Sequence, residues 1–173
     1  MELAERLFRT YHETLVRYLT RRLGDRDWAE EVAQETFVRA MRQERIVNER
    51  SWVFAVAHNL VRDGARRDAR NRRHLELLAA EERGAHEPAA DQTMERAHEA
   101  AFARRALEAL GERDRHALLL KEEGLDYAEI ADVLQIERNS VGTTLSRARR
   151  RLAESYEALV RSSGSQGGSH AAS

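Results

Sequence analysis

SWVFAVAHNLVRDGARRDARNRR, residues 51–73, is the stretch that decides the fold of this chain. Its second half carries six arginines against two acids, Asp63 and Asp68. The sequence therefore predicts one helix that is anchored in a core at one end and cationic at the other, a candidate footprint for a phosphate backbone. A solvated amphipathic helix is the alternative that this stretch alone leaves open. The core end is predicted from apolar residues at helical spacing, namely Trp52, Val53, Val56, Ala57, Leu60 and Val61.

Two further amphipathic helices are predicted before this stretch. The first covers about residues 2–23 and ends at Gly24, because its apolar residues recur at three- and four-residue steps. The second begins after Asp27, which has Glu30 three residues on, as in a capping box. Residues 43–50 have no periodicity and are predicted to be a loop, and Ser51 is the expected cap of the third helix. The second helix is expected to bury one stripe, formed by Trp28, Val32, Ala33, Phe37, Ala40 and Met41.

The composition changes after residue 73. Residues 76–99 are rich in Asp and Glu, and Gly84 and Pro88 interrupt helical continuity. This pattern predicts a linker at residues 80–92 that joins two helical units. The tail, residues 162–173, is rich in Ser and Gly and is expected to be disordered.

The C-terminal part contains the pattern of a helix-turn-helix. Residues 125–134 form a short amphipathic helix in which Asp126 and Glu129 have capping-box spacing, residues 135–138 form a turn, and Asn139 caps the last helix. The second helix of this motif lies in the major groove of DNA, with its first residues facing the base edges. A helical hairpin with a solvated arginine face is the alternative. The candidate base-contacting residues are Arg138, Asn139, Ser140, Gly142, Thr143, Thr144 and Ser146, and Arg147, Arg149, Arg150 and Arg151 are suited to phosphates.

Composition argues against several other classes of protein. The chain has no cysteine, which excludes disulfides and thiolate metal sites, and no apolar run approaches the roughly 18 residues of a membrane span. The seven histidines are scattered, and there is neither a GxGxxG nor a Walker pattern. We therefore expect no enzyme activity, no cofactor and no metal site. The net charge of -1 hides the segregation of acids and bases along the chain.

Three segments together resemble an extracytoplasmic-function sigma factor, a compact bacterial transcription initiation factor. They are residues 27–42 (DWAEEVAQETFVRAMR), 51–73 and 125–152, in the order of the family, and the resemblance covers residues 3–160. It implies an all-α fold of two small helical domains. Region two, a helical bundle, would occupy residues 1–79, and region four, with the helix-turn-helix, residues 93–161, joined by the flexible linker 80–92. It also implies a cytoplasmic protein that directs core RNA polymerase to promoters and nucleates DNA strand opening.

The resemblance also implies three groups of site residues. The group that would dock on the clamp coiled coil of core polymerase is Asp27, Glu30, Glu31, Gln34 and Glu35. The group that would read the minus-ten element as a single strand is Asn59, Arg62, Asp63, Arg66, Arg67 and Arg70, with Asn59 near the flipped-out base. The group that would read the minus-thirty-five element, while another surface of the domain meets the polymerase flap, is Arg138, Asn139, Ser140, Gly142, Thr143, Thr144, Ser146, Arg147 and Arg150.

The chain departs from the family pattern at two places in the helix-turn-helix. Thr144 stands where the family often has an arginine, so the minus-thirty-five sequence is not carried over. Gln135 stands where a glycine is common, which carries a cost if that residue needs a positive φ. Trp52 matches a position that we expect to be in the core rather than stacked on a base.

Two other functions remain open at this point. A helix-turn-helix transcriptional regulator would bind duplex DNA alone, without polymerase. An interaction protein would serve mainly to be captured by a partner, and an anti-sigma factor is a common partner of the family, although nothing in the sequence identifies one. In the free protein the two domains could close on each other, and the acids of residues 76–99 are then a candidate mask for the arginines.

Overall fold

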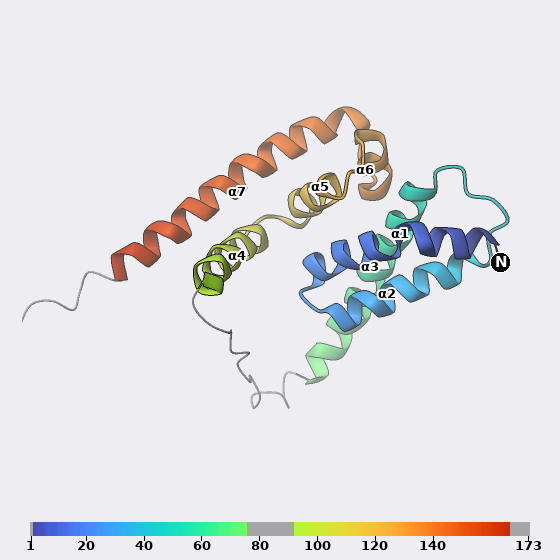
Figure 1. Cartoon of the computed structure of the whole chain (residues 1–173), viewed down its shortest axis with the longest axis horizontal. Helices are drawn as coiled ribbons and strands as arrows, with labels where there is room; N and C mark the ends of the chain where they lie inside the picture. The colour runs from blue at the N-terminus through green and yellow to red at the C-terminus, as the bar shows by residue number, and fades with distance from the viewer. Residues whose placement is uncertain (1, 76–91, 167–173) are drawn as a thin grey trace, which may run out of the picture. The chain divides into compact units, whose positions relative to one another are not determined.

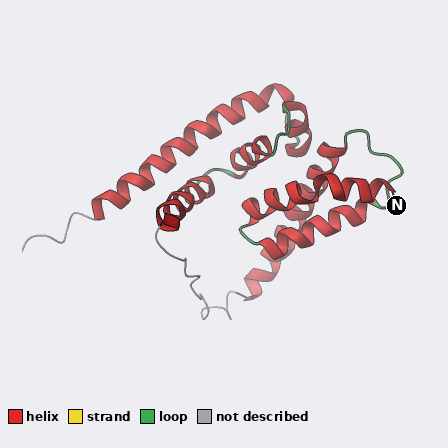
Figure 2. Cartoon of the chain, viewed as in Figure 1, coloured by secondary structure: helices red, strands yellow, loops and turns green. Residues whose placement is uncertain are grey.

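The computed structural model of the chain describes residues 2–75 and 92–166. Across these residues every regular element is a helix, which confirms the all-α prediction (Figure 2). The helices follow one another along the chain as labelled in Figure 1. They are α1 (Glu2–Leu23), α2 (Arg26–Ala40), α3 (Glu49–Leu75), α4 (Gln92–Glu108), α5 (Glu112–Glu122), α6 (Tyr127–Leu134) and α7 (Arg138–Gln166).

The helices divide into two compact units that do not follow the order of the chain. The first unit contains Met1–Arg83 and Leu119–Val141, and therefore holds α1, α2, α3 and α6. The second contains Gly84–Leu118 and Gly142–Ser173, and therefore holds α4, most of α5 and most of α7. None of the described helices is long and apolar enough to cross a membrane.

The core of the first unit forms where α1 packs along α2 and α3 lies against both. The rings of Tyr18 and Phe54 meet edge to face at its centre, with centroids 5.3 Å apart. Helix α6 packs on α3 and adds its own apolar side chains. The side chains with less than 2% exposure include Leu7, Leu15, Leu19, Val53, Leu125, Ile130 and Val133.

The buried face of α3 is rotated relative to the face expected from the sequence. Val53, Phe54, Ala57 and Val61 are buried, whereas Trp52 is only half-buried, so the prediction that Trp52 lies in the core was wrong. Consecutive residues on a helix point about 100° apart, and Phe54 rather than Trp52 completes the stripe of three- and four-residue steps. The helix begins at Glu49, two residues before its predicted cap Ser51, so Ser51 lies inside the helix and is not its cap.

The helix ends test several predictions about capping. Gly24 ends α1 with φ +70°, and Asp126 and Glu129 form both hydrogen bonds of a capping box on α6, as predicted. For α2 the prediction was wrong, because Asp25 is the N-cap and accepts a hydrogen bond from the backbone N–H of Trp28 at 3.0 Å. Asp27 instead lies in the first turn.

The helix-turn-helix forms as predicted, with α6 and α7 joined by residues 135–137. Gln135 ends α6 with φ +56°, the left-handed conformation that favours glycine. Helix α7 begins one residue before the predicted cap Asn139 and continues to Gln166, past Ser162, where disorder was expected. Residues 167–173 and most of the predicted linker, residues 80–91, lie outside the described residues.

Candidate nucleic-acid interface

The first candidate surface lies in the middle of α3. Asn59 is half-buried, while Arg62 and Asp63, three and four residues further along the helix, are exposed. Their spacing puts all three side chains on one face of α3, away from the buried Phe54 and Ala57. The backbone of Arg66, Arg67 and Arg70 continues the same helix, and their side chains lie outside the described part of the structure.

His58, which precedes Asn59 on α3, is neutral and holds a guanidinium group near this surface. The guanidinium of Arg22 donates a hydrogen bond to Nδ1 of His58 at 3.0 Å. Burial, which is the largest cause, and the positive charges of Arg22 and Arg62 together lower the pKa of His58 from 6.5 to about 4. The ring is therefore neutral at physiological pH and accepts rather than repels the guanidinium. Arg22 was not predicted as part of this site, because only the packing of α1 against α3 brings it there.

The lowered pKa makes the stability of the first unit depend on pH. Unfolded chains bind a proton at His58 near pH 6.5, whereas the folded chain binds it only near pH 4. Between these values the unfolded state holds more protons, so folding weakens as the pH falls. We expect the free energy of unfolding to drop by about 1–2 kcal/mol between pH 7 and pH 5 through this group. Solvent screening of the partly exposed ring limits the size of this drop.

Urea denaturation at both pH values would measure this loss, followed by the fluorescence of Trp28 and Trp52, both of which belong to the first unit. In His58→Gln the loss should be absent, whereas the control His98→Gln, on exposed α4 of the second unit, should keep it. An unchanged pH dependence in His58→Gln would contradict the assignment.

The second candidate surface is the outer face of α2. Asp27, Glu31, Gln34 and Glu35 are all exposed on it, as the sequence predicted for a solvent-facing helix side. Glu30 is the exception, because it is half-buried and its carboxylate lies 3.2 Å from Nε2 of His12 on α1. The structure thus leaves four of the five predicted residues open to a partner.

Apolar side chains adjoin these acids, which the sequence did not predict. Met41 was assigned to the buried stripe of α2 but is 59% exposed, and Val38 is 44% exposed. Val38 follows Gln34 by four residues, so the two lie on the same side of the helix. Exposed apolar residues beside polar ones are typical of protein–protein contact surfaces. We call Asp27, Glu31, Gln34, Glu35, Val38 and Met41 the α2 surface.

The third candidate surface is the start of α7. Five of the predicted base-contacting residues are exposed there: Arg138, Asn139, Ser140, Thr143 and Ser146. Gly142 is half-buried, and Thr144 is only 5% exposed because it lies beside the buried Leu145 and Ala148 on the inner face of the helix. Arg150 is exposed and lies 3.9 Å from Glu154 one turn later.

Arg147 is held by a buried acid rather than projecting freely. Its guanidinium donates two hydrogen bonds to the carboxylate of Asp114 on α5, at 2.6 and 3.2 Å, and Arg151 donates a third at 3.0 Å. The side chain of Asp114 is only 4% exposed. These donors, Arg147 above all, hold the pKa of Asp114 below its usual range, so the carboxylate stays ionised. The arrangement fixes α7 to α5 within the second unit.

Comparison with known proteins gives matches over both helical parts. Residues 7–71 match the model of Sigma-70 region 2, and residues 103–152 match that of Sigma-70, region 4. The ferric citrate uptake sigma factor FecI of Escherichia coli (strain K12) is 32% identical over 148 residues, which are 83% of this chain and 85% of that protein. The RNA polymerase sigma factor YlaC of Bacillus subtilis (strain 168) is 31% identical over 155 residues, 84% and 87% of the two chains.

Comparison with solved structures shows a shared fold. The sigma factor RpoE of Bartonella quintana, in a crystal with the anti-sigma factor NepR, matches with a TM-score of 0.68 and 21% sequence identity. The match covers 88% of this chain and 96% of that one. At this identity the likeness concerns the fold.

Proposed function

This chain is a sigma-70 family protein of the extracytoplasmic-function type, an RNA polymerase sigma factor for transcription initiation, and from that premise we propose which of its surfaces carries each step. Proteins of this family are not enzymes, so the site residues bind and position rather than catalyse. We place region two at residues 1–79, the linker at 80–92 and region four at 93–161.

The α2 surface docks on the clamp coiled coil of core polymerase. The observation that carries this assignment is the combination of exposed acids with the exposed apolar side chains of Val38 and Met41 on one helix. Acids favour a cationic partner and steer its approach, while the apolar side chains lose water on contact. Glu30 is not part of this surface in the proposal, because its carboxylate contacts His12 and links α2 to α1.

The surface of α3 formed by Asn59, Arg62 and Asp63 binds the minus-ten element as a single strand. Asn59 offers both a hydrogen-bond donor and an acceptor, which suits the exposed edge of an unpaired base. Arg62 and the arginines that follow on α3 supply charge for the phosphates, and the Arg22–His58 pair adds a further cation beside them.

The exposed start of α7 reads the minus-thirty-five element as duplex DNA. Asn139, Ser140 and Thr143 are exposed and can reach base edges, and Arg138 and Arg150 are suited to phosphates. Thr144 and Arg147 act differently in this proposal. Thr144 packs inside, and Arg147 holds the helix in place through Asp114.

The partners in this proposal are core polymerase, promoter DNA and an anti-sigma factor, and the location is the cytoplasm. Two features support it: both sigma regions are present in this chain, and the solved structure with the same fold belongs to a sigma factor in complex with the anti-sigma factor NepR.

Run-off transcription with core polymerase and a library of promoter fragments tests the proposal as a whole. The purified chain should start transcription at a defined subset of fragments, and only when core polymerase is present. A regulator that acts alone would instead bind duplex fragments tightly without polymerase, with affinity falling steeply as salt rises. That result, without core-dependent initiation, would overturn the proposed roles of the surfaces.

Glu31→Ala is expected to weaken binding to core polymerase about threefold to tenfold, because it removes one exposed charge from the α2 surface. Fluorescence anisotropy with labelled protein and core polymerase would measure the change. Glu13→Ala is the matched control, since Glu13 is an exposed glutamate on α1, outside the α2 surface. Equal affinities for the two variants would contradict docking through α2.

A further inference from the structure

An acidic segment of the helix-turn-helix lies against a cationic face of α1 and α3 within the first unit. Residues 122–132 contain five acids and no lysine or arginine. Opposite them, α1 and the start of α3 contribute Arg17, Arg21 and Arg50. The two sides are therefore complementary in charge.

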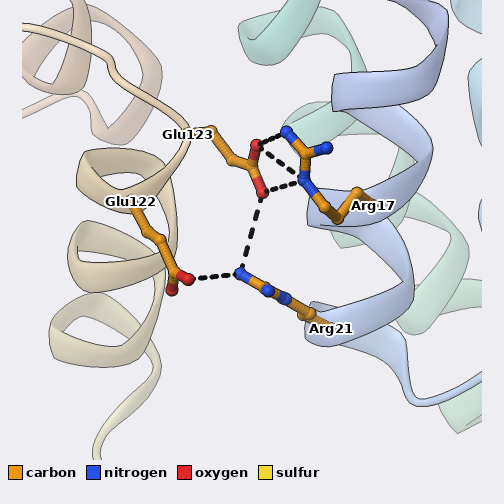
Figure 3. Close-up of polar contacts among 4 residues, drawn as sticks. All are labelled: Arg17, Arg21, Glu122 and Glu123. Carbon is orange, nitrogen blue, oxygen red and sulfur yellow. Dashed lines mark hydrogen bonds and ion pairs between the residues drawn. The ribbon is translucent and has the colours of Figure 1, made fainter.

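The strongest contact joins Arg17 to Glu123. Nε of Arg17 lies 3.1 Å from both carboxylate oxygens and Nη2 lies 2.6 Å from one of them, so the pair is bidentate. The side chain of Glu123 is only 2% exposed. Arg21 lies one turn further along α1 and pairs with Glu122 at 2.7 Å, next to the first pair (Figure 3).

The start of α3 holds the same segment further along. Nη1 of Arg50 donates a hydrogen bond to the carbonyl oxygen of Gly124 at 2.7 Å and lies 3.6 Å from the Glu129 carboxylate. Ser51 donates a hydrogen bond to Asp132 on α6 at 3.2 Å. These polar contacts surround the packing of α6 on α3, in which Leu125, Ile130 and Val133 are buried.

A chain closed in this way cannot reach both promoter elements. The minus-ten and minus-thirty-five elements are about 25 base pairs apart, roughly 85 Å along the duplex. Helix α6 packs directly on α3, and the four residues from Leu134 to Arg138 span at most about 14 Å. The start of α7 is thus held close to α3, far short of the separation that promoter binding requires.

We propose that these contacts form an ion-pair latch that keeps the free protein closed and must open before it binds core polymerase and promoter together. The latch consists of Arg17, Arg21 and Arg50 on region two and Glu122, Glu123 and Glu129 on region four. The segment that occupies the cationic face of α1 and α3 is thus the chain's own acidic segment, residues 122–132. Because all three of its arginines are partly exposed, salt should weaken the latch.

Distance measurements on the free protein test the latch directly. The chain has no cysteine, so Glu13→Cys and Glu137→Cys, both at exposed positions of the first unit, provide two unique labelling sites. Arg17→Glu should shift the label separation to longer values and broaden it, and so should 0.5 M salt in the wild type. The double variant Arg17→Glu with Glu123→Arg restores opposite charges and should recover the short separation. The matched control is Arg9→Glu, an exposed arginine two turns earlier on α1.

The more exposed pair Arg21–Glu122 serves as a second test, in case substitution of the buried Glu123 prevents folding. Arg21→Glu and its swap with Glu122→Arg should repeat the pattern, and circular dichroism should show that each variant keeps its helices. Unchanged separations in both single variants would overturn the latch.

Affinity for core polymerase tests whether the latch inhibits binding. This measurement rests on the proposed docking to polymerase, whereas the label separations in the free protein do not. A protein that must open first binds with an affinity reduced by its open fraction. Arg17→Glu should therefore bind core polymerase about fivefold more tightly than wild type, and the charge swap should return to the wild-type value. Longer separations without any gain in affinity would show a contact that inhibits nothing and overturn the proposal.

Discussion

Replacing Asn59 with alanine is expected to reduce run-off transcription from a cognate promoter about 10- to 100-fold while affinity for core polymerase stays nearly unchanged. A specific hydrogen-bonded base contact contributes about 1–3 kcal/mol of discrimination, and each 1.4 kcal/mol is a factor of ten. The side chain is half-buried on α3, on the face that carries Arg62 and Asp63. Alanine keeps the helix and removes only the amide.

The docking variant provides the reciprocal control for this experiment. Glu31→Ala should lower core affinity, and its transcription defect should disappear at saturating core polymerase. The defect of Asn59→Ala should persist at saturation, because it concerns DNA rather than docking. Loss of core affinity in Asn59→Ala, in step with its loss of transcription, would show that the residue shapes region two and does not read a base.

Replacing Asp114 with alanine is expected to destabilise the second unit by about 2 kcal/mol. The change removes three hydrogen bonds between charged groups and leaves Arg147 and Arg151 without their buried acceptor. Breaking a deeply buried pair costs more, but these guanidiniums are partly exposed and solvent compensates them. Because α7 then loses its attachment to α5, we also expect weaker minus-thirty-five binding in the transcribing complex.

Tryptophan fluorescence does not report on the second unit, because both tryptophans lie in the first. Hydrogen exchange of the peptides that cover α5 and α7 would therefore measure this loss of stability. The pKa of Asp114 is lowered in the folded state, so its contribution is present above about pH 4 and is lost as the pH falls further. Asp114→Asn, which keeps one acceptor oxygen, should lie between wild type and Asp114→Ala. Faster exchange confined to the first unit would contradict this account.

Much of this architecture was predictable from local sequence. The periodicity of residues 2–23 and 51–73, Gly24 and the Asp126–Glu129 capping box each determine structure within one or two turns of helix. The same local reasoning was wrong between Asp25 and Asp27. Both are acids at a plausible distance from the helix start, and only the hydrogen bond to Trp28 distinguishes them.

The candidate sites were predictable as types of surface but not in detail. Nothing near Arg147 in sequence indicates that Asp114, 33 positions earlier, turns it inward. Arg22 and His58 meet only because α1 packs on α3. The acids predicted to mask the arginines were those of residues 76–99, and residues 76–91 lie outside the described structure. Among the acids that do contact arginines of α1 and α3 are those on the segment after Lys121, and in the strongest pair Glu123 is 106 residues from Arg17.

The reciprocal charges of Arg17 and Glu123 have a consequence for how the protein behaves when concentrated. Contacts between two parts of one chain can form equally well between two copies, which gives a domain-swapped dimer. The chain that connects the parts keeps them at an effective concentration in the millimolar range, so the monomer closes on itself in dilute solution. If salt is removed while the sample stays concentrated, some of the open chains would close on a neighbouring copy and form exchanged pairs.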